Sequence, residues 1–529
     1  MVIKQNDYQV MNITVLIKQI MKKLLFSIFV FASFLSCKAQ EQQKKQKKPN
    51  VIFIFSDDQR FNSLSMTGDP IAETPNIDQL AKEGVFFNNA YITSPICGPS
   101  RANIFTAQWE RKNKIGFTNI SKHVISEKTY QNSWQAQLKN AGYSTAFIGK
   151  HHTKIGDRKD TPLVENTDFS YYGNGHLGFY PAKKHKQFNN LKNETQVEGL
   201  LEATKAYLTQ GDDYKYFYEN ADPSIKNQLK KRDPNKPFSA WINLNLPHAS
   251  SIGGMGSRET DPEYYKTKYN DVKHKIELPD GYPQKISLPE NVYATSDLMK
   301  YYVTANKGKL LNEKLKMERA IYAIDLMVGN LRAFLKEIGE AENTIIVFCS
   351  DNGLFLGEHG LGGKTILYDE SVHVPMIVYS PYFKDKTIGK EVDELVVGQD
   401  IPATILEMCG VKTPQSYQGK SMLPLINGEN KDWRKDIFLE NLFTDQGYPR
   451  QEGVRSQQFK YIRSFSKEND RNKYIPEQTI DTDEKPIYEE LFDIINDPKE
   501  QNNLVGNKEY IEVLNTYRER CKTLVKELN

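Results

Sequence analysis

Cysteine is scarce in this sequence: five occur among 529 residues, and their spacing suggests no disulfide framework. A protein of this size does not need one, because disulfides mainly support small exported domains. Cys349 continues the apolar stretch 345–348 and is expected in the core, whereas Cys409, before Gly410, is expected at a helix end. Cys97 fits neither pattern, so its role has to be sought in its neighbours.

A strong charge of either sign is also missing. The 70 lysines and arginines nearly balance the 67 aspartates and glutamates, which leaves a net charge of +3. This balance gives no reason to expect nucleic-acid binding. An anionic substrate would therefore be recognised by local charges within a pocket.

No apolar run is long enough to span a membrane. The clearest run, 24–35, follows the basic residues 21–23 and is typical of a signal peptide. We expect a signal region at residues 1–37, with Met21 as a second candidate start. Phe-Leu-Ser-Cys at 34–37 also resembles a bacterial lipobox, so lipid attachment at Cys37 and plain signal cleavage both stay open. Either route predicts export, to the periplasm, to a membrane anchor or into the medium.

Strands and helices alternate after a polar segment. Residues 38–49 are rich in Gln, Lys and Glu and are expected to form a tether. Because helical patterns lie between continuous apolar runs, the sequence predicts a three-layer α/β sandwich at 50–430, with a large mixed and mainly parallel sheet. The apolar runs lie at 51–55, 144–148, 238–244, 344–348 and 374–379.

Three further patterns complete the organisation. Thr74-Pro75 predicts the start of a helix that Gly84 ends. The polar, aromatic-rich stretch 155–235 has weak periodicity and is expected to form insertions over one end of the sheet. Short runs at 460–463 and 488–493, with a helical pattern at 507–527, predict a smaller C-terminal subdomain at 431–529, built from an antiparallel sheet and a helix.

Two of the predicted strands end in acidic residues. Asp57-Asp58 follows the first strand, and Asp351-Asn352 follows the strand at 344–348. Ligands of open α/β sheets bind beyond the carboxyl ends of the strands, so these side chains could converge. Their oxygen atoms suit calcium better than zinc. The simpler interpretation is that each pair belongs to an ordinary loop or turn.

Cys97 lies where a short helix is expected to begin. Pro99 and Ser100 open a helical pattern that runs from Arg101 to Ala107. Free N–H groups and the positive end of the dipole favour an anion at such a position. The alternative is an exposed thiol beside a helix cap.

Cys97-x-Pro99-x-Arg101 matches the signature of type I, formylglycine-dependent sulfatases, and the chain resembles this family of the alkaline phosphatase superfamily over roughly residues 48–430. Further motifs occur in the family's order, and a C-terminal pattern at 491–493 and 496–498 also looks similar. These motifs are Asn50–Asp58, Thr74–Asp78, Gly149–His152, Ser350–Gly353, Gly357–Gly360, and Lys364 before Tyr368–Ser371.

The resemblance implies an alkaline phosphatase-like fold, a calcium ion and a modified cysteine. A maturase would oxidise Cys97 to formylglycine, whose hydrate is the nucleophile, and Arg101 would hold that hydrate and the metal site. One calcium ion per chain would be bound by Asp57, Asp58, Asp351 and Asn352.

Four more residues would complete the pocket. The resemblance places Lys150 and Lys364 on sulfate oxygens, and it makes His248 or Lys364 the general acid and His152 the base. Lys150 and His152 follow one strand on the same side, with His151 pointing away. Each has a simpler interpretation: a surface lysine at 150, a loop histidine at 248, or an idle charge in the glycine-rich loop around 364. His123, His176 and Arg60 are weaker candidates for substrate contact.

Departures from the family pattern concern the substrate and leave the reaction class intact. His151 stands where many members have tryptophan, and His373 where arginine is frequent. Because export is predicted, we expect a sulfatase that acts on oligosaccharides derived from sulfated polysaccharides. The alternatives are a phosphodiesterase or phosphonate hydrolase of the same superfamily and a catalytically dead glycan-binding homologue. Aromatic residues expected to stack on sugar rings are Tyr171, Tyr172, Phe179 and Tyr180.

Overall fold

The computed structural model describes Met21 and residues 47–117, 124–156, 160–293, 306–429, 431–442, 448–465 and 484–529. The chain divides into two compact units, Met1–Lys48 and Pro49–Asn529, and the elements below belong to the second. Apart from Met21, the expected signal region with Cys37 lies outside the described residues, as do most of the tether and His123. Within the described part, no helix is both long and apolar enough to cross a bilayer. The expected boundary at residue 430 stays a prediction.

An eight-stranded sheet forms the centre of the second unit, in the order β11-β2-β10-β7-β1-β6-β4-β5. β1 pairs in parallel with β6 and β7, whereas β10 runs antiparallel to β7 and β2. The expected mixed, mainly parallel sheet is thus confirmed, and all five apolar runs form strands in it. The strands are β1 (Asn50–Asp57), β2 (Val85–Phe87), β4 (Ser144–His151), β5 (Phe169–Asn174), β6 (Phe238–Pro247), β7 (Thr344–Ser350), β10 (Met376–Tyr379) and β11 (Lys390–Val392).

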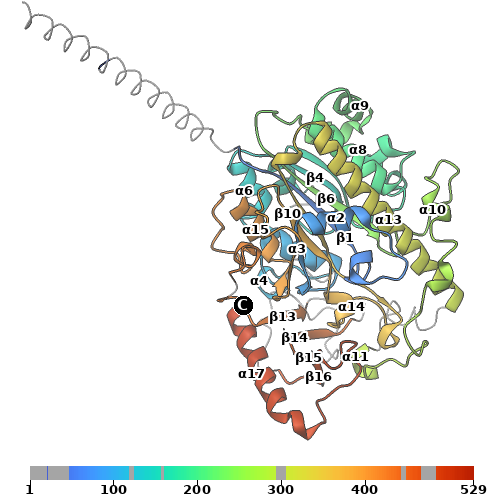
Figure 1. Ribbon diagram of the computed structural model, residues 1–529, viewed down its shortest axis with the longest axis vertical. Coiled ribbons are helices and arrows are strands. Elements are labelled where there is room, and N and C mark those ends of the chain that lie inside the picture. Colours follow the sequence, from blue (N-terminus) through green and yellow to red (C-terminus); the bar gives the residue numbers. More distant parts are fainter. Residues whose placement is uncertain are drawn as a thin grey trace, which may run out of the picture. The chain divides into compact units, whose positions relative to one another are not determined.

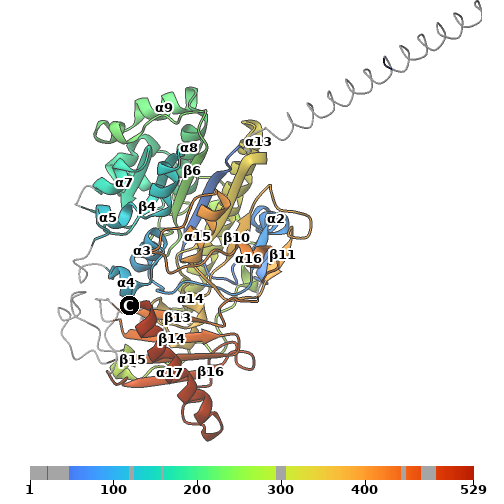
Figure 2. The ribbon, with the colours of Figure 1, turned by 90° about the vertical axis from the view of Figure 1, so that its left-hand side faces the viewer.

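Helices cover both faces of the sheet, so the second unit has three layers (Figures 1 and 2). One face packs on α2 (Pro75–Glu83), α8 (Gln196–Thr209) and α13 (Lys307–Glu337), and the other on α3 (Cys97–Thr106), α6 (Trp134–Asn140) and α15 (Asp400–Met408). β1 is buried along its whole length, and its side chains alternate between the two cores, with Ile52 and Ile54 on one side and Phe53 on the other. This explains its continuous apolar sequence.

α2 begins after Thr74 and ends before Gly84, as predicted, but a residue from another helix stabilises its first turn. Thr74 is the N-cap residue, but its side chain accepts no cap hydrogen bond. Asp325, in the middle of α13, instead accepts from the backbone N–H groups of Asn76 and Ile77 at 2.9 and 2.8 Å. A carboxylate at a helix N-terminus satisfies free N–H groups and interacts favourably with the dipole. The cap therefore comes from a residue far away in the sequence.

The C-terminal residues form the expected small sheet and helix. β13 (Asp436–Asn441), β14 (Arg450–Ser456), β15 (Phe459–Phe465) and β16 (Tyr488–Asp493) are antiparallel, and α17 (Ile511–Leu528) packs against them through Leu514 and Val525. Buried ion pairs join this sheet to α4 (Glu110–Asn113), for example Arg111 with Glu440 at 2.8 Å. Figure 1 shows the sheet and α17 at the C-terminal end of the coloured chain.

The stretch 155–235 is more regular than expected. It contributes the edge strand β5 and helix α8 to the main sheet and its cover, followed by α9 (Asp212–Asn220). The expected stacking of Tyr171, Phe179 and Tyr180 on sugars is wrong, because these side chains are at most 3% exposed in the core. Tyr172 packs against His151.

Short elements elsewhere are β3 (Ala90–Tyr91), β8 (Phe355–Leu356), β9 (Gly362–Gly363), β12 (Val396–Val397), α4 (Glu110–Asn113), α5 (Glu127–Tyr130), α7 (Thr161–Glu165), α10 (Tyr264–Thr267), α11 (Glu290–Tyr293), α14 (Asp369–Val372) and α16 (Leu423–Ile426).

Candidate active site

Two neighbouring strand ends bring the expected oxygen-bearing side chains together. β1 and β7 pair in parallel register, so the residues that follow them meet at one edge of the sheet. The backbone N–H of Asp58 donates to Asp351 Oδ1 at 3.2 Å, and Asn352 Nδ2 donates to Asp58 Oδ1 at 2.6 Å. All three, together with Asp57, are at most 1% exposed. The structure thus places the four predicted ligands in one buried group.

Cys97 is the first residue of α3 and reaches the same group. Its Sγ lies 3.4 Å from Asp57 Oδ1, and Lys364 Nζ donates to it at 2.7 Å. Burial and then the charge of Asp57 raise the pKa of the Cys97 thiol. The unmodified side chain is therefore protonated at neutral pH and is a poor nucleophile.

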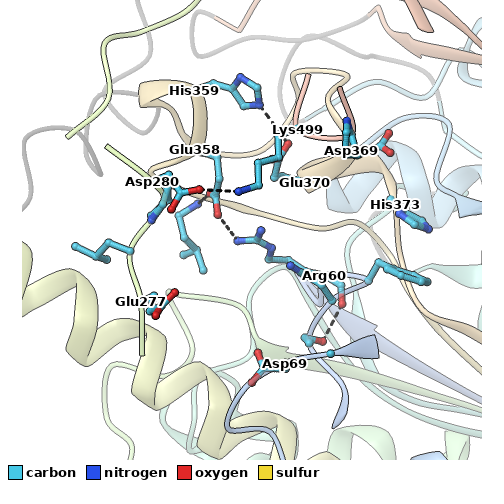
Figure 3. A pocket seen from close by; sticks show the side chains of 18 of the residues that line it. Arg60, Asp69, Glu277, Asp280, Glu358, His359, Asp369, Glu370, His373 and Lys499 are labelled. Atoms are coloured by element: carbon cyan, nitrogen blue, oxygen red, sulfur yellow. Dashed lines mark hydrogen bonds and ion pairs between the residues drawn. The ribbon is translucent and has the colours of Figure 1, made fainter. Parts of the chain in front are cut away.

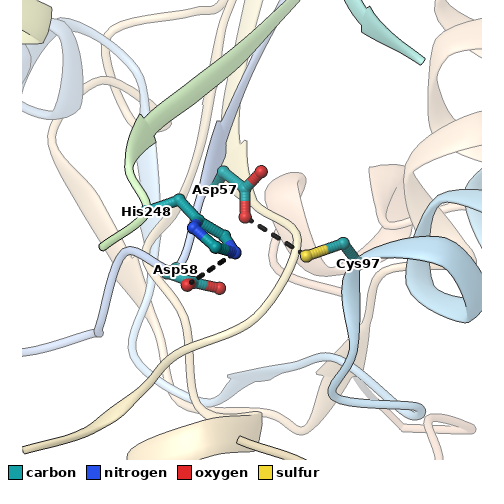
Figure 4. A group of neighbouring side chains, drawn as sticks. All are labelled: Asp57, Asp58, Cys97 and His248. Atoms are coloured by element: carbon teal, nitrogen blue, oxygen red, sulfur yellow. Dashed lines mark hydrogen bonds and ion pairs between the residues drawn. The ribbon is translucent and has the colours of Figure 1, made fainter. Parts of the chain in front are cut away.

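Two of the predicted metal ligands, Asp57 and Asp58, lie in a tight group with Cys97 and His248. Ligand atoms of Asp57, Asp58, Cys97 and His248 all lie within 4.8 Å of one another. Figure 4 shows them pointing toward a common centre from different elements. His248 follows β6, and its Nε2 lies 3.6 Å from Asp58 Oδ2.

Arg101 lies one helical turn after Cys97 in α3, and its guanidinium group holds Asp351 and Asn243 together. Its Nε and Nη2 contact Asp351 Oδ2 at 2.9 and 2.8 Å, and its Nη1 donates to Asn243 Oδ1 at 2.9 Å. The guanidinium carbon lies 5.0 Å from the ring centroid of Phe55. The planar guanidinium group donates to these acceptors at fixed angles from several N–H groups, which a lysine ammonium group could not do.

Two lysines supply the remaining positive charge. Lys150, at the end of β4, is fully buried and forms an ion pair with Asp57, whose Oδ2 also accepts from Asn245 Nδ2 at 2.8 Å. Lys364 contacts Asp58 as well as Cys97. The preceding Gly149 has φ of 102°, and a Cβ there would lie 2.0 Å from the carbonyl oxygen of Asn243. β4 can therefore present Lys150 only with glycine before it.

The charges of the site are balanced without a metal ion. The three carboxylates of Asp57, Asp58 and Asp351 face the three cations of Arg101, Lys150 and Lys364. Burial alone would raise the pKa of Asp57, but the lysines and arginine hold it well below its usual range. Burial and the charge of Asp57 raise the pKa of Asp351 to about 6. An added divalent cation would make the site positive and suited to an anion.

Residues 49–411 match the family model described as Sulfatase. The chain belongs to the sulfatase family. A second model, described as N-sulphoglucosamine sulphohydrolase, C-terminal, matches residues 357–527. The protein is therefore a sulfuric ester hydrolase, and the three-layer fold is that of its family.

Relatives of this sulfatase cover most of the chain. It is 29% identical to an N-acetylglucosamine-6-O-sulfatase of Bacteroides thetaiotaomicron over 90% of this chain and 86% of the relative. It is 27% identical to an ulvan-active sulfatase of Formosa agariphila over 95% of this chain and 86% of the relative. A solved structure in complex with its substrate D-glucosamine-2-N,6-O-disulfate has a similar fold, with a TM-score of 0.67, 22% identity and coverage of 91% of this chain and 98% of that one.

Three histidines line up beside the charged centre of the sulfatase. The ring centroids of His152 and His176 are 4.9 Å apart, and those of His176 and His248 are 4.4 Å apart. Ser250 joins the last two, because its Oγ lies 2.9 Å from Nδ1 of each ring. Burial, followed by nearby positive charges, lowers the pKa of all three, that of His176 to about 2.

The tautomer of His248 follows from its neighbour. The backbone N–H of Ser250 donates to His248 Nδ1 at 3.1 Å. Nδ1 is then an acceptor, so in the neutral ring the proton sits on Nε2, the nitrogen that faces Asp58. His248 therefore presents an N–H donor to the centre of the site.

The residues present fit a hard divalent cation. Asn352 Oδ1 is buried and accepts no hydrogen bond from any described residue. Such an orphaned oxygen beside two buried carboxylates is the kind of ligand that calcium prefers. Asp351 is engaged differently, since its oxygens already accept from Arg101 and from the Asp58 backbone.

All ten predicted site residues lie at this edge of the sheet. Four further residues beside them had no clear signal in the sequence. Asn243 and Asn245 orient Arg101 and Asp57 from β6, and alternate asparagines in an apolar strand could have drawn attention to them. His176 was only a weak candidate, and Ser250 was not expected. His151, as strand alternation predicts, packs away from the centre against Phe147.

Proposed function

We propose that this protein is an exported, calcium-dependent sulfatase that removes sulfate from sugars of sulfated polysaccharides and uses a formylglycine made from Cys97. The observation that carries the proposal is the contact of Cys97 with both Asp57 and Lys364 at the start of α3. A nucleophile made at this position has the predicted metal ligand on one side and a cation on the other.

Two groups would be added to the chain. A maturase would convert Cys97 to formylglycine, whose hydrate supplies a hydroxyl nucleophile that a buried thiol does not. Calcium would be held by Asp57, Asp58, Asp351 and Asn352, and it would supply charge stabilisation for the nucleophile and the sulfate oxygens. The oxygen-rich donor set and the free Asn352 Oδ1 support calcium over zinc.

The remaining residues bind the ester and move protons. Lys150 and Lys364 neutralise sulfate oxygens, and Arg101 keeps Asp351 in place. His248 carries its proton on Nε2 and donates it to the alcohol oxygen as the bond to sulfur breaks. His152 has an Nδ1 without a hydrogen-bond partner among the described residues, which suits the role of a base.

The substrate proposal comes from the relatives. The first is described as an N-acetylglucosamine-6-O-sulfatase and another as an ulvan-active sulfatase, so both printed names refer to carbohydrate. A sulfated oligosaccharide is a substrate that an exported enzyme meets outside the cytoplasm. The basic and apolar segment at 21–35, followed by Cys37, supports export to the periplasm or to a lipid anchor.

A substrate panel tests the proposal. The protein, produced together with a maturase, is assayed on sulfated oligosaccharides and on the sulfate and phosphate versions of one aryl ester. We expect desulfation of the sugars and a preference for sulfate over phosphate. A large preference for phosphate would favour a phosphodiesterase or phosphonate hydrolase, and activity on aryl sulfates alone would contradict a carbohydrate substrate.

A further inference from the structure

Lys364 lies in the loop 359–368, whose two ends contact each other. The rings of His359 and Tyr368 pack together with their centroids 4.2 Å apart. His359 Nε2 also lies 3.5 Å from Glu370 Oε2, just beyond the loop. Figure 3 shows His359 and Glu370 at the wall of a cavity of about 650 Å³. The loop that carries Lys364 is therefore closed at its base.

The backbone of this loop adopts a conformation that its own residues do not favour. Thr365 has φ of 88° and His359 has φ of 55°, both in the region that glycine prefers. A β-branched residue at positive φ is an outlier, and such a backbone persists only where surrounding contacts hold it. The Thr365 side chain is no such contact, because its buried Oγ1 has no hydrogen-bond partner among the described residues. Contacts from outside the loop therefore hold Lys364 in place.

Three strands of the C-terminal sheet, β14 to β16, supply such contacts at the end of the loop. The Tyr368 hydroxyl donates to Glu490 Oε1 in β16 at 2.5 Å. The backbone N–H just before Tyr368 donates to Gln451 Oε1 in β14 at 3.2 Å. Asp369 Oδ1 accepts from Lys460 Nζ in β15 at 2.6 Å. Each strand thus holds one point of the same short segment.

These contacts are shielded from water. Tyr368, Lys460 and Glu490 are at most 2% exposed. A buried hydrogen bond that is lost cannot be replaced by one to solvent, so its geometry is strongly maintained. The place of Lys364 beside Cys97 therefore depends on a sheet that contributes none of the predicted site residues.

We propose that the C-terminal sheet completes the active site by holding the Lys364 loop, and that Tyr368 is a positioning residue that acts through Lys364. The inference rests on the proposed role of Lys364 at the sulfate oxygens. An ammonium group that moves away from the reacting atoms stabilises their developing charge less, even when the rest of the site is intact. The hydrogen bond of Tyr368 to Glu490 should therefore affect the rate of the reaction as well as the stability of the fold.

Two tyrosine variants test this role. Tyr368→Phe removes the hydroxyl and keeps the ring, and kcat/KM on a sulfate ester should fall about tenfold or more. Tyr461→Phe is the matched control, because Tyr461 is also buried and donates to Glu489 at 2.5 Å. Glu489 and Glu490 are successive in β16 and point to opposite faces of the sheet. Tyr461→Phe should keep kcat/KM within about twofold, and equal losses in the two variants would overturn the proposal.

A double-mutant cycle shows whether the effect passes through Lys364. In a Lys364→Met enzyme no ammonium group is left to misplace. Adding Tyr368→Phe to that enzyme should therefore lower kcat/KM by less than about twofold. The same loss with and without the Lys364 ammonium group would mean that Tyr368 only supports the fold or acts on another group, and the proposal would be wrong.

Hydrogen exchange separates this inference from the proposed function. The backbone N–H of Thr365 donates to the Pro95 carbonyl at 3.1 Å, and its exchange is followed in the full chain with Cys97 unmodified. Exchange should be faster in Tyr368→Phe and unchanged in Tyr461→Phe. Faster exchange in a protein that cleaves no sulfate ester would reject the proposed function but keep the hold of the sheet on the loop. Unchanged exchange in an active sulfatase would reject that hold and keep the function.

Discussion

Lys364 Nζ lies 2.7 Å from Cys97 Sγ, although 267 residues separate them in the sequence. The same ammonium group contacts Asp58, so it joins the start of α3 to the end of β1. A cation held in this position stabilises negative charge on whatever is attached to residue 97 or on an anion bound beside it.

Replacing Lys364 tests that role. Lys364→Met keeps the length of the side chain and removes its charge, so kcat should fall by about 10²–10³, the usual loss for one oxyanion contact. The fall is measured with saturating sulfate ester. Lys386→Met, at an exposed position, serves as the control and should retain full activity. A Lys364→Met enzyme within threefold of the parent would contradict the role.

Arg101→Lys should destabilise the protein even though the positive charge is kept. Lysine cannot reach Asp351, Asn243 and the Leu244 carbonyl together, so buried acceptors lose their donors. Each buried acceptor left without a donor should cost about 1–3 kcal/mol of the free energy of unfolding, measured by chemical denaturation. Arg332→Lys, in a partly exposed pair with Glu83, should cost less than about 1 kcal/mol. Equal losses would argue against a special role of Arg101.

Calcium should stabilise the folded protein. At a free concentration about 100-fold above its Kd, the ion should add about 2.7 kcal/mol to the free energy of unfolding. Thermal unfolding after chelation, with calcium or zinc added back, measures this effect. Asn352→Leu removes the free Oδ1 and should weaken the calcium response. An undiminished response in that variant would remove Asn352 from the ligand set.

His248 should matter most for esters with poor leaving groups. If its Nε2–H protonates the departing alcohol, His248→Ala should cost about 10²–10⁴ in kcat on a sugar sulfate and far less on an aryl sulfate whose phenolate leaves readily. Equal losses on both substrates would rule out the acid role. Ser250→Ala keeps the backbone N–H that sets the His248 tautomer, so its effect should be much smaller.

Much of the architecture could be predicted because burial leaves a clear pattern. The apolar runs of β1, β4, β6, β7 and β10 follow directly from a sheet covered on both faces. β2, β5 and β11 were not expected, since they are short or lie at an edge of the sheet, where pairing partners decide the conformation. Asp325 shows the same limit, because its cap on α2 exists only once α13 packs beside it.

The candidate site was predictable to a similar extent. Strand ends and a helix start explain why Asp57, Asp351 and Cys97 meet. Tyr180 shows why residue type alone misleads: its ring is buried under Arg258, 3.5 Å away, and its hydroxyl donates to Asp261. The cavity lined by Arg60 and Glu318 could not be predicted as a cavity, although Arg60 was a weak candidate for substrate contact, because segments far apart in the sequence create it.

The most direct test of the account is the mass of the peptide that contains Cys97, taken from enzyme of known specific activity. Production with a maturase should yield a residue in which –CH₂SH has become –CHO, and activity should rise in proportion to the converted fraction. Fully active enzyme with an unmodified thiol at position 97, or a Cys97→Ala variant that keeps the parent's activity, would contradict the account.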